Sequence, residues 1–219
     1  MKLSNPNLKF RMNWKKIDKN NRKQEDGIYT AWKQQIADEC YHQCVYCAIH
    51  EAPWGGIDHY HIDHFRPQSK FDELKNKITN LYYSCPICNK FKSDDWKNEP
   101  DNLNDICYPD PSDHNYSDLF NWDKTNHTLE GIYVSSKYLV NRLYLNRPQL
   151  IYERREYFLK AKADALISEV NRLIQLSDDL ILVKEAFEII SSLAHHLHIR
   201  STISPYKLVD IKKPKKNCE

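Results

Sequence analysis

The chain has 219 residues, of which 41% are hydrophobic and 12% aromatic, so it can build one elaborated domain or two small ones with a packed core. Its formal net charge of +2 argues against a strongly basic protein that binds nucleic acid by charge alone. Neither a transmembrane-length apolar run nor the apolar stretch of a signal peptide is present, which predicts a cytoplasmic protein with reduced cysteines.

The N-terminal part is basic and leads into a predicted helix. Residues 1–27 are polar and are expected to form an irregular arm that docks through Phe10 and Trp14. From about Ile28 to Gln43 the apolar residues recur at helical spacing, which predicts a helix.

Two Cys-x-x-Cys pairs follow, Cys44 with Cys47 and Cys85 with Cys88. Four thiolates at this spacing suit a tetrahedral, structural zinc, whose binding then contributes to folding. A redox pair or an iron–sulfur site is the alternative, but redox chemistry does not need two pairs around an Asp-His. We expect these residues to be bystanders rather than ligands: Cys40, Cys107, Cys218, His42, His50 and His59.

The segment between the cysteine pairs is predicted to be a strand, a turn and a returning strand. Tyr60–Phe65 alternates and Leu81–Ser84 follows, after which the second cysteine pair opens a helix that carries Asn89. On a strand, Asp63 and His64 point to opposite faces.

Residues 101–136 contain many Asp, Asn and Pro residues and are predicted to be loops with one strand, Thr128–Val134, in a hairpin. Helical spacing begins at Pro148, and a second helix is predicted over about Asp178–His198, so the two form an antiparallel hairpin. Lys212–Lys216 is predicted to be a charged terminus.

The tract over residues 40–97 resembles the HNH nucleases, which have the ββα-metal or His-Me finger fold. His64 matches the first motif histidine, Asn80 the middle asparagine and Asn89 the last position. The cysteine frame resembles phage resolvase-type and bacterial HNH enzymes. The strings that begin at Asp63 and Asn89 also resemble the HNH domain of CRISPR effector nucleases, which lack the cysteines. The expected fold is α+β and mostly helical, a ββα-metal core with structural zinc between an N-terminal helix and a C-terminal helical hairpin.

Hydrolysis of a phosphodiester explains these residue types. A neutral imidazole can take a proton from water near neutral pH, which suits His64 as the general base. Oxygen ligands from Asp63 and Asn89 suit Mg²⁺ or Mn²⁺, and Asn80 is expected to orient the loop or the His64 ring. The contact to the scissile phosphate is expected from Lys92, Arg66 or His61, with Lys92 favoured.

A wider resemblance links His64–Pro67, Tyr108–Pro111 and Leu145–Leu150 to the PtuB-like HNH components of Septu and retron anti-phage systems. Those proteins typically carry Glu before the catalytic His, where this chain has Asp63. The resemblance implies an ATPase partner. Residues 40–147 hold eleven Lys/Arg against fifteen Asp/Glu. The positive side chains that bind the phosphates of the substrate are therefore expected from the segments on either side or from a partner protein.

The predicted organisation is an arm over residues 1–27, an HNH nuclease domain over 28–147, and a helical hairpin with a basic tail over 148–219. The predicted function is a metal-dependent DNA endonuclease of anti-phage defence. Two alternatives stay open, an RNase that uses the same site, for example on tRNA, and a non-catalytic zinc module that binds nucleic acid or protein. The helical hairpin either completes the nuclease core or docks a partner.

Overall fold

The computed structural model describes residues 14, 16–19, 22–24, 27–175 and 180–202. The chain divides into two compact units. The first is Arg11–Leu150, and the main part of the second begins at Ile151. Several features expected from the sequence lie outside the described residues: Phe10, most of the arm, the start of the second hairpin helix at Asp178, the tail Lys212–Lys216 and Cys218.

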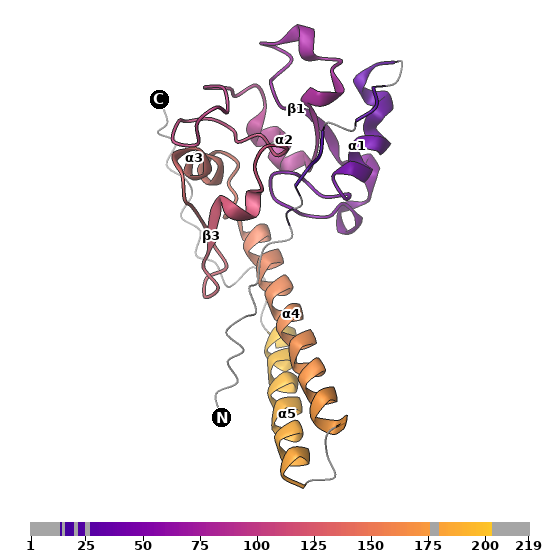
Figure 1. Ribbon diagram of the computed structural model, residues 1–219, viewed down its shortest axis with the longest axis vertical. Coiled ribbons are helices and arrows are strands. Elements are labelled where there is room, and N and C mark those ends of the chain that lie inside the picture. Colours follow the sequence, from indigo (N-terminus) through magenta and orange to yellow (C-terminus); the bar gives the residue numbers. More distant parts are fainter. Residues whose placement is uncertain (1–13, 15, 20–21, 25–26, 176–179, 203–219) are drawn as a thin grey trace. The chain divides into compact units, whose positions relative to one another are not determined.

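A two-stranded antiparallel sheet and one helix lie at the centre of the first unit. Strand β1 (His61–His64) pairs with β2 (Leu81–Ser84), and helix α2 (Pro86–Lys92) follows β2 and packs against β1 (Figure 1). Every residue of β2 is buried, which fits its run of large apolar and aromatic side chains. The predicted ββα core is confirmed, with β1 one residue shorter at each end than Tyr60–Phe65.

The start of α2 is set by the second cysteine pair. Cys85 is the N-cap, and its Sγ accepts a hydrogen bond from the backbone N–H of Cys88 at 3.4 Å. Pro86 takes the first helical position, where its missing N–H costs nothing. The residues that begin the helix therefore also bring two thiols together.

The predicted N-terminal helix is present but shorter than Ile28–Gln43. A 3₁₀ turn, Tyr29–Trp32, leads into α1 (Lys33–Glu39), which packs on the β1–β2 hairpin. Tyr41 then has a φ of 55°, in the left-handed region, which ends the helix. The loop that follows is tied to the sheet, since the N–H of Val45 donates to the carbonyl of Tyr83 at 3.0 Å.

The segment after α2 contains a predicted hairpin and a helix that the sequence did not predict. β3 (Phe120–Trp122) pairs with β4 (Leu129–Gly131), so the hairpin is confirmed. The predicted strand Thr128–Val134 was too long, because helix α3 (Val134–Arg142) begins at its last residue and packs on β4.

Gly131 and Ser136 explain why the strand gives way to α3. A Cβ on Gly131 would lie 2.2 Å from the backbone nitrogen of Lys137, so only glycine allows β4 to approach the helix this closely. The Ser136 hydroxyl accepts a hydrogen bond from the N–H of Tyr133 at 2.9 Å and satisfies a donor at the start of the helix.

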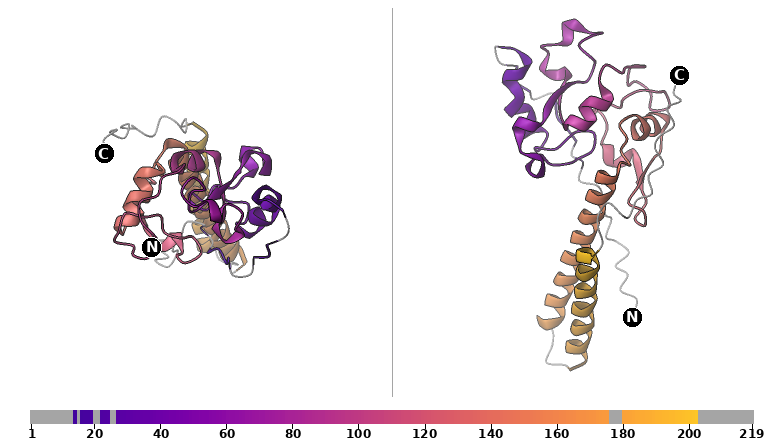
Figure 2. Two further views of the ribbon diagram at one scale, coloured as in Figure 1. Left: turned by 90° about the horizontal axis from the view of Figure 1, so that it is seen from above. Right: turned by 180° about the vertical axis from the view of Figure 1, so that it is seen from behind.

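The second unit is the predicted helical hairpin. Helices α4 (Pro148–Gln175) and α5 (Leu180–Thr202) run side by side in Figure 1 and in the right view of Figure 2, and α5 ends four residues beyond the predicted His198. None of the helices in the described ranges combines the length and the apolar character that crossing a membrane requires. The interior of the hairpin is a small apolar cluster of Val170, Leu173, Ala186 and Ile189.

Candidate functional site

Four thiols from the two cysteine pairs converge in the core of the first unit. Cys44 and Cys47 come from the loop after α1, whereas Cys85 and Cys88 come from the start of α2, and all four are buried. Their Sγ atoms lie within 4.8 Å of one another, with those of Cys47 and Cys85 3.8 Å apart. Zn–S bonds of about 2.3 Å in a tetrahedron place sulfurs about 3.8 Å apart. The predicted cluster is therefore confirmed as an arrangement positioned to bind a metal.

The neighbouring cysteines and histidines do not join this cluster. Cys40 and Cys107 are buried free thiols. His42 lies between two carboxylates, 3.0 Å from an oxygen of Asp38 and 3.0 Å from one of Glu51. Among the described residues, the metal-binding group found consists of the four cysteines. Two other histidines near the first cysteine pair also lie outside it, His50 and His59.

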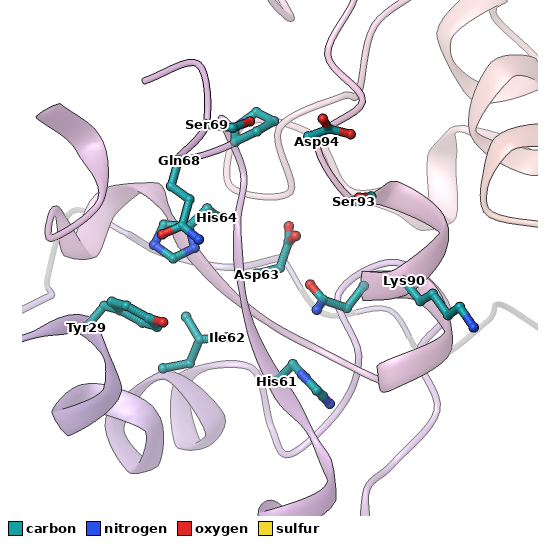
Figure 3. A pocket seen from close by; sticks show the side chains of 12 residues that line it. Tyr29, His61, Ile62, Asp63, His64, Gln68, Ser69, Lys90, Ser93 and Asp94 are labelled. Carbon is teal, nitrogen blue, oxygen red and sulfur yellow. The ribbon is translucent and has the colours of Figure 1, made fainter. Parts of the chain in front are cut away.

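A pocket of about 490 Å³ lies beside β1, the loop that follows it and α2 (Figure 3). The residues predicted as the general base and as ligands of the catalytic metal line it: His64, Asp63 and Asn89. They come from two adjacent positions of β1 and from the helix after β2, so the pairing of β1 with β2 is what brings them to one pocket.

Asp63 and His64 project to opposite sides of β1, as alternation along a strand requires (Figure 3). Asp63 points toward α2, where it meets Lys92, and His64 points toward Tyr29. A phosphate that lies across the end of β1 would therefore have the Asp63 carboxylate, a ligand for a cation, on one side and the His64 imidazole on the other.

The Asp63 carboxylate is buried and held from two sides. The side chain of Tyr46 donates to Oδ2 at 2.5 Å, and the ammonium of Lys92 donates to Oδ1 at 3.1 Å. Each carboxylate oxygen has a second lone pair. Asp63 can therefore keep both contacts and still offer an oxygen to a cation in the pocket.

The hydrogen bond of His64 defines its tautomer. Nε2 lies 3.0 Å from the backbone carbonyl oxygen of Lys75, which can only accept, so Nε2 carries the hydrogen. In the neutral ring Nδ1 is then the proton acceptor. Burial lowers the pKa of His64 below its ordinary value, which favours the neutral form at neutral pH. Tyr29 packs edge-on against the ring, with centroids 4.7 Å apart.

The segment that contains the cysteine cluster and most of the pocket matches one protein family. Residues 44–95 match the model of the HNH endonuclease family. The chain carries an HNH endonuclease domain. Comparisons with curated proteins and with solved structures give no match. The family model covers the four cysteines and every residue that lines the pocket except Tyr29, so the predicted HNH resemblance is confirmed for residues 44–95.

Asn80 of the HNH domain closes the loop between the two strands. Its side-chain oxygen accepts from the N–H of Arg66 at 2.9 Å, and its side-chain nitrogen donates to the carbonyls of Arg66 at 3.0 Å and Leu74 at 3.4 Å. Asn80 thus contacts the loop backbone, and the bond to the His64 ring is made by Lys75 instead.

We expect Asn80→Ala to destabilise the domain by about 1–3 kcal/mol, because it leaves partly buried backbone groups of the loop without the partner that Asn80 provides. Urea unfolding measures this loss. As a control, Asn98→Ala removes an exposed amide that donates to the carbonyl of Ile106, and it should change stability by less than about 0.5 kcal/mol. Equal midpoints for the two variants would contradict a structural role for Asn80.

The residues expected to contact phosphate take different places. Lys92 is fully buried, and its ammonium donates to Asp63 and to the backbone carbonyl of His64 at 2.7 Å. Arg66 forms an ion pair with Glu99 at 2.5 Å. His61 is exposed and lines the pocket. Of the three, His61 is therefore the one that reaches the pocket.

We expect Lys92→Met to destabilise the domain by about 3–5 kcal/mol, because it leaves the buried Asp63 carboxylate without its cation. Lys90→Met is the matched control, since Lys90 is on the same helix but exposed, and its effect should stay within about 0.5 kcal/mol. Chemical denaturation of both variants gives the comparison. If Lys92→Met were as stable as Lys90→Met, the buried pair would have no structural role.

Tyr29 and Lys90 also line the pocket and are not among the residues predicted for the site. Tyr29 precedes α1 and reaches the pocket only because α1 packs on the strands, so no local pattern marks it. Lys90 follows Asn89 directly, so its positive charge next to the motif could have indicated a residue that faces the pocket.

Proposed function

We propose that the HNH domain is a metal-dependent endonuclease that hydrolyses phosphodiester bonds of DNA. The observation that carries this proposal is the single pocket shared by Asp63, Asn89 and a His64 whose Nδ1 is left to accept a proton. A binding module without catalysis has no need for an imidazole oriented in this way by a backbone carbonyl.

We propose two metals with separate roles. The cysteine cluster fits a structural zinc, because four buried thiols have tetrahedral spacing and no position is left for substrate. Reduced thiolates of this kind also suit the cytoplasm. Asp63 and Asn89 would hold Mg²⁺ or Mn²⁺, which prefer oxygen ligands. Such a cation, when bound, supplies positive charge to the phosphate and to the leaving oxygen.

The residues of the chain divide the remaining work. His64 Nδ1 takes a proton from water as the water oxygen bonds to phosphorus, while the carbonyl of Lys75 holds the ring. The bond from phosphorus to the 3′ oxygen breaks, and that oxygen gains a proton from solvent. The products are a 5′-phosphate and a 3′-hydroxyl. Lys90 and His61 line the pocket, and we expect them to contact phosphate groups of the substrate.

Digestion of defined substrates tests the proposal. Purified protein with Mg²⁺ or Mn²⁺ is incubated with plasmid, single-stranded DNA and total RNA in parallel, with EDTA as the control. Metal-dependent DNA cleavage supports the proposal. Cleavage of RNA alone would make the protein an RNase, and cleavage of neither, with zinc bound, would favour a binding module.

We propose further that the protein works with an ATPase in anti-phage defence. The support is the wider resemblance and the exposed apolar side chains of the hairpin, for example Val183, Phe187 and Ile190, which suit an interface. An ATPase gene is then expected beside the gene for this chain, and the two products should co-elute from a sizing column. Phe187→Asp should separate them, whereas co-elution that Phe187→Asp does not change, or separate elution of the unaltered proteins, would contradict the proposal.

A further inference from the structure

Arg147 lies outside the residues matched to the HNH family, yet its side chain enters the cysteine cluster. It is 5% exposed. One guanidinium nitrogen lies 3.6 Å from the sulfur of Cys88, and the other lies 3.7 Å from that of Cys47, 3.8 Å from that of Cys85 and 3.6 Å from that of Cys88. A single side chain therefore contacts both cysteine pairs.

Charge explains why a guanidinium belongs there. Four thiolates around a divalent cation carry a net charge of −2, and burying net charge is costly unless an opposite charge is close. An arginine side chain stays protonated in proteins, so the Arg147 guanidinium brings a positive charge to the cluster.

The backbone holds Arg147 in this position. It sits in the short junction between α3 and α4, where its N–H donates to the carbonyl of Tyr144 at 3.0 Å. The preceding residue, Asn146, pairs with both backbone groups of Leu129 at 2.8 Å. Arg147 also donates to the carbonyl of Leu143 at 3.2 Å. Contacts within the protein therefore hold the Arg147 side chain toward the sulfurs.

The planar fork of arginine matters as much as its charge. One terminal nitrogen contacts the sulfurs of Cys47, Cys85 and Cys88, while the other contacts Cys88 and donates to the carbonyl of Leu143. A lysine has a single nitrogen at its end, so it could not make both sets of contacts at once. Groups that donate to metal ligands in this way typically change metal affinity by about 10–100-fold.

We propose that Arg147 is a positioning residue of the four-cysteine metal site, which compensates the charge of the thiolates and joins the two cysteine pairs. The inference rests on the proposed zinc. It extends the metal site beyond residues 44–95 and links metal retention to the junction that precedes α4.

Two substitutions and one matched control test the proposal. Arg147→Met removes the charge and the donors, and Arg147→Lys keeps the charge but loses the fork. Arg22→Met is the control, because Arg22 is also buried and donates to the carbonyls of Ile78 and Leu81, away from the cysteines. Each protein is measured for zinc content, for the rate of zinc transfer to a coloured chelator, and, after exchange with Co²⁺, for its sulfur-to-cobalt absorption bands.

We expect zinc transfer to be faster by about 10–100-fold in Arg147→Met and by less in Arg147→Lys. The cobalt bands should move to longer wavelength in Arg147→Met, because sulfurs that lose hydrogen bonds give up electrons more readily. Arg22→Met should lower stability without moving the bands. If Arg147→Met does not fold, the zinc-transfer rate and the cobalt bands of Arg147→Lys test the proposal instead.

Unchanged bands and an unchanged transfer rate in a folded Arg147 variant would overturn the inference. Equal acceleration by Arg22→Met would also overturn it, since the effect would then come from general loss of stability. Wild-type protein without bound zinc would instead contradict the proposed zinc itself, so the two failures can be told apart.

Discussion

His64→Ala is expected to slow phosphodiester cleavage by about 10²–10⁴-fold, the range that a general base contributes. The ring is half-buried and hydrogen-bonds to the carbonyl of Lys75, so the fold should survive its removal. Single-turnover cleavage of a labelled duplex in Mg²⁺ measures the rate. Circular dichroism and urea unfolding of the same samples establish whether the variant is folded.

The control for His64→Ala is another histidine of the HNH domain. His59 is exposed and does not line the pocket, so His59→Ala should cleave at close to the wild-type rate. Added imidazole should restore part of the rate to His64→Ala, because it can enter the space of the missing ring. A folded His64→Ala that cuts as fast as wild type would rule out His64 as the base, and a loss that imidazole leaves unchanged would indicate a different role for the ring.

Features that depend on neighbours in the sequence could be predicted. The strand Leu81–Ser84 has the predicted bounds. Its short run of large apolar and aromatic residues is typical of a buried strand, and Pro86 begins the helix that follows. The two-residue gap between Cys85 and Cys88 similarly places both thiols on one turn of helix.

Lys92 shows where local patterns stop being informative. Its spacing from Asn89 predicted a contact with phosphate, and that spacing says only that the two side chains lie one turn apart. Whether Lys92 faces the pocket or the core depends on how α2 packs against β1, and the packing buries its ammonium against Asp63. The neighbouring Lys90 faces the pocket instead.

Arg147 shows the same limit over a longer range. It is 100 positions from Cys47 in the sequence, and its role depends on the path of the chain through β3, β4 and α3. Helix α3 was not predicted because Val134, Ser135 and Ser136 are weak helix formers. The contact of Ser136 with Tyr133, which stabilises the start of the helix, becomes apparent in the structure.

Removal of the proposed zinc is expected to unfold the HNH domain. Structural zinc contributes about 10 kcal/mol or more to the folding of small domains, which is comparable to the whole stability of a typical domain, about 5–15 kcal/mol. The sheet of the ββα core has only two short strands, so little else can replace that contribution. Without the metal, the charged Arg147 and the burial of four thiols would also oppose the folded state.

Cys88→Ser is the substitution that tests this, with Cys107→Ser as the matched control. Both sulfurs are buried, but Cys107 lies outside the cluster and donates only to the carbonyl of Asn102. Cys107→Ser should retain one zinc per chain and the near-ultraviolet circular dichroism of the buried tyrosines around β2. Cys88→Ser should lose both, as should wild type treated with a strong chelator. Because His64, the proposed base, lies on β1, cleavage should fall with the dichroism signal. Activity that persists after the zinc has gone would show that the ββα core folds without it.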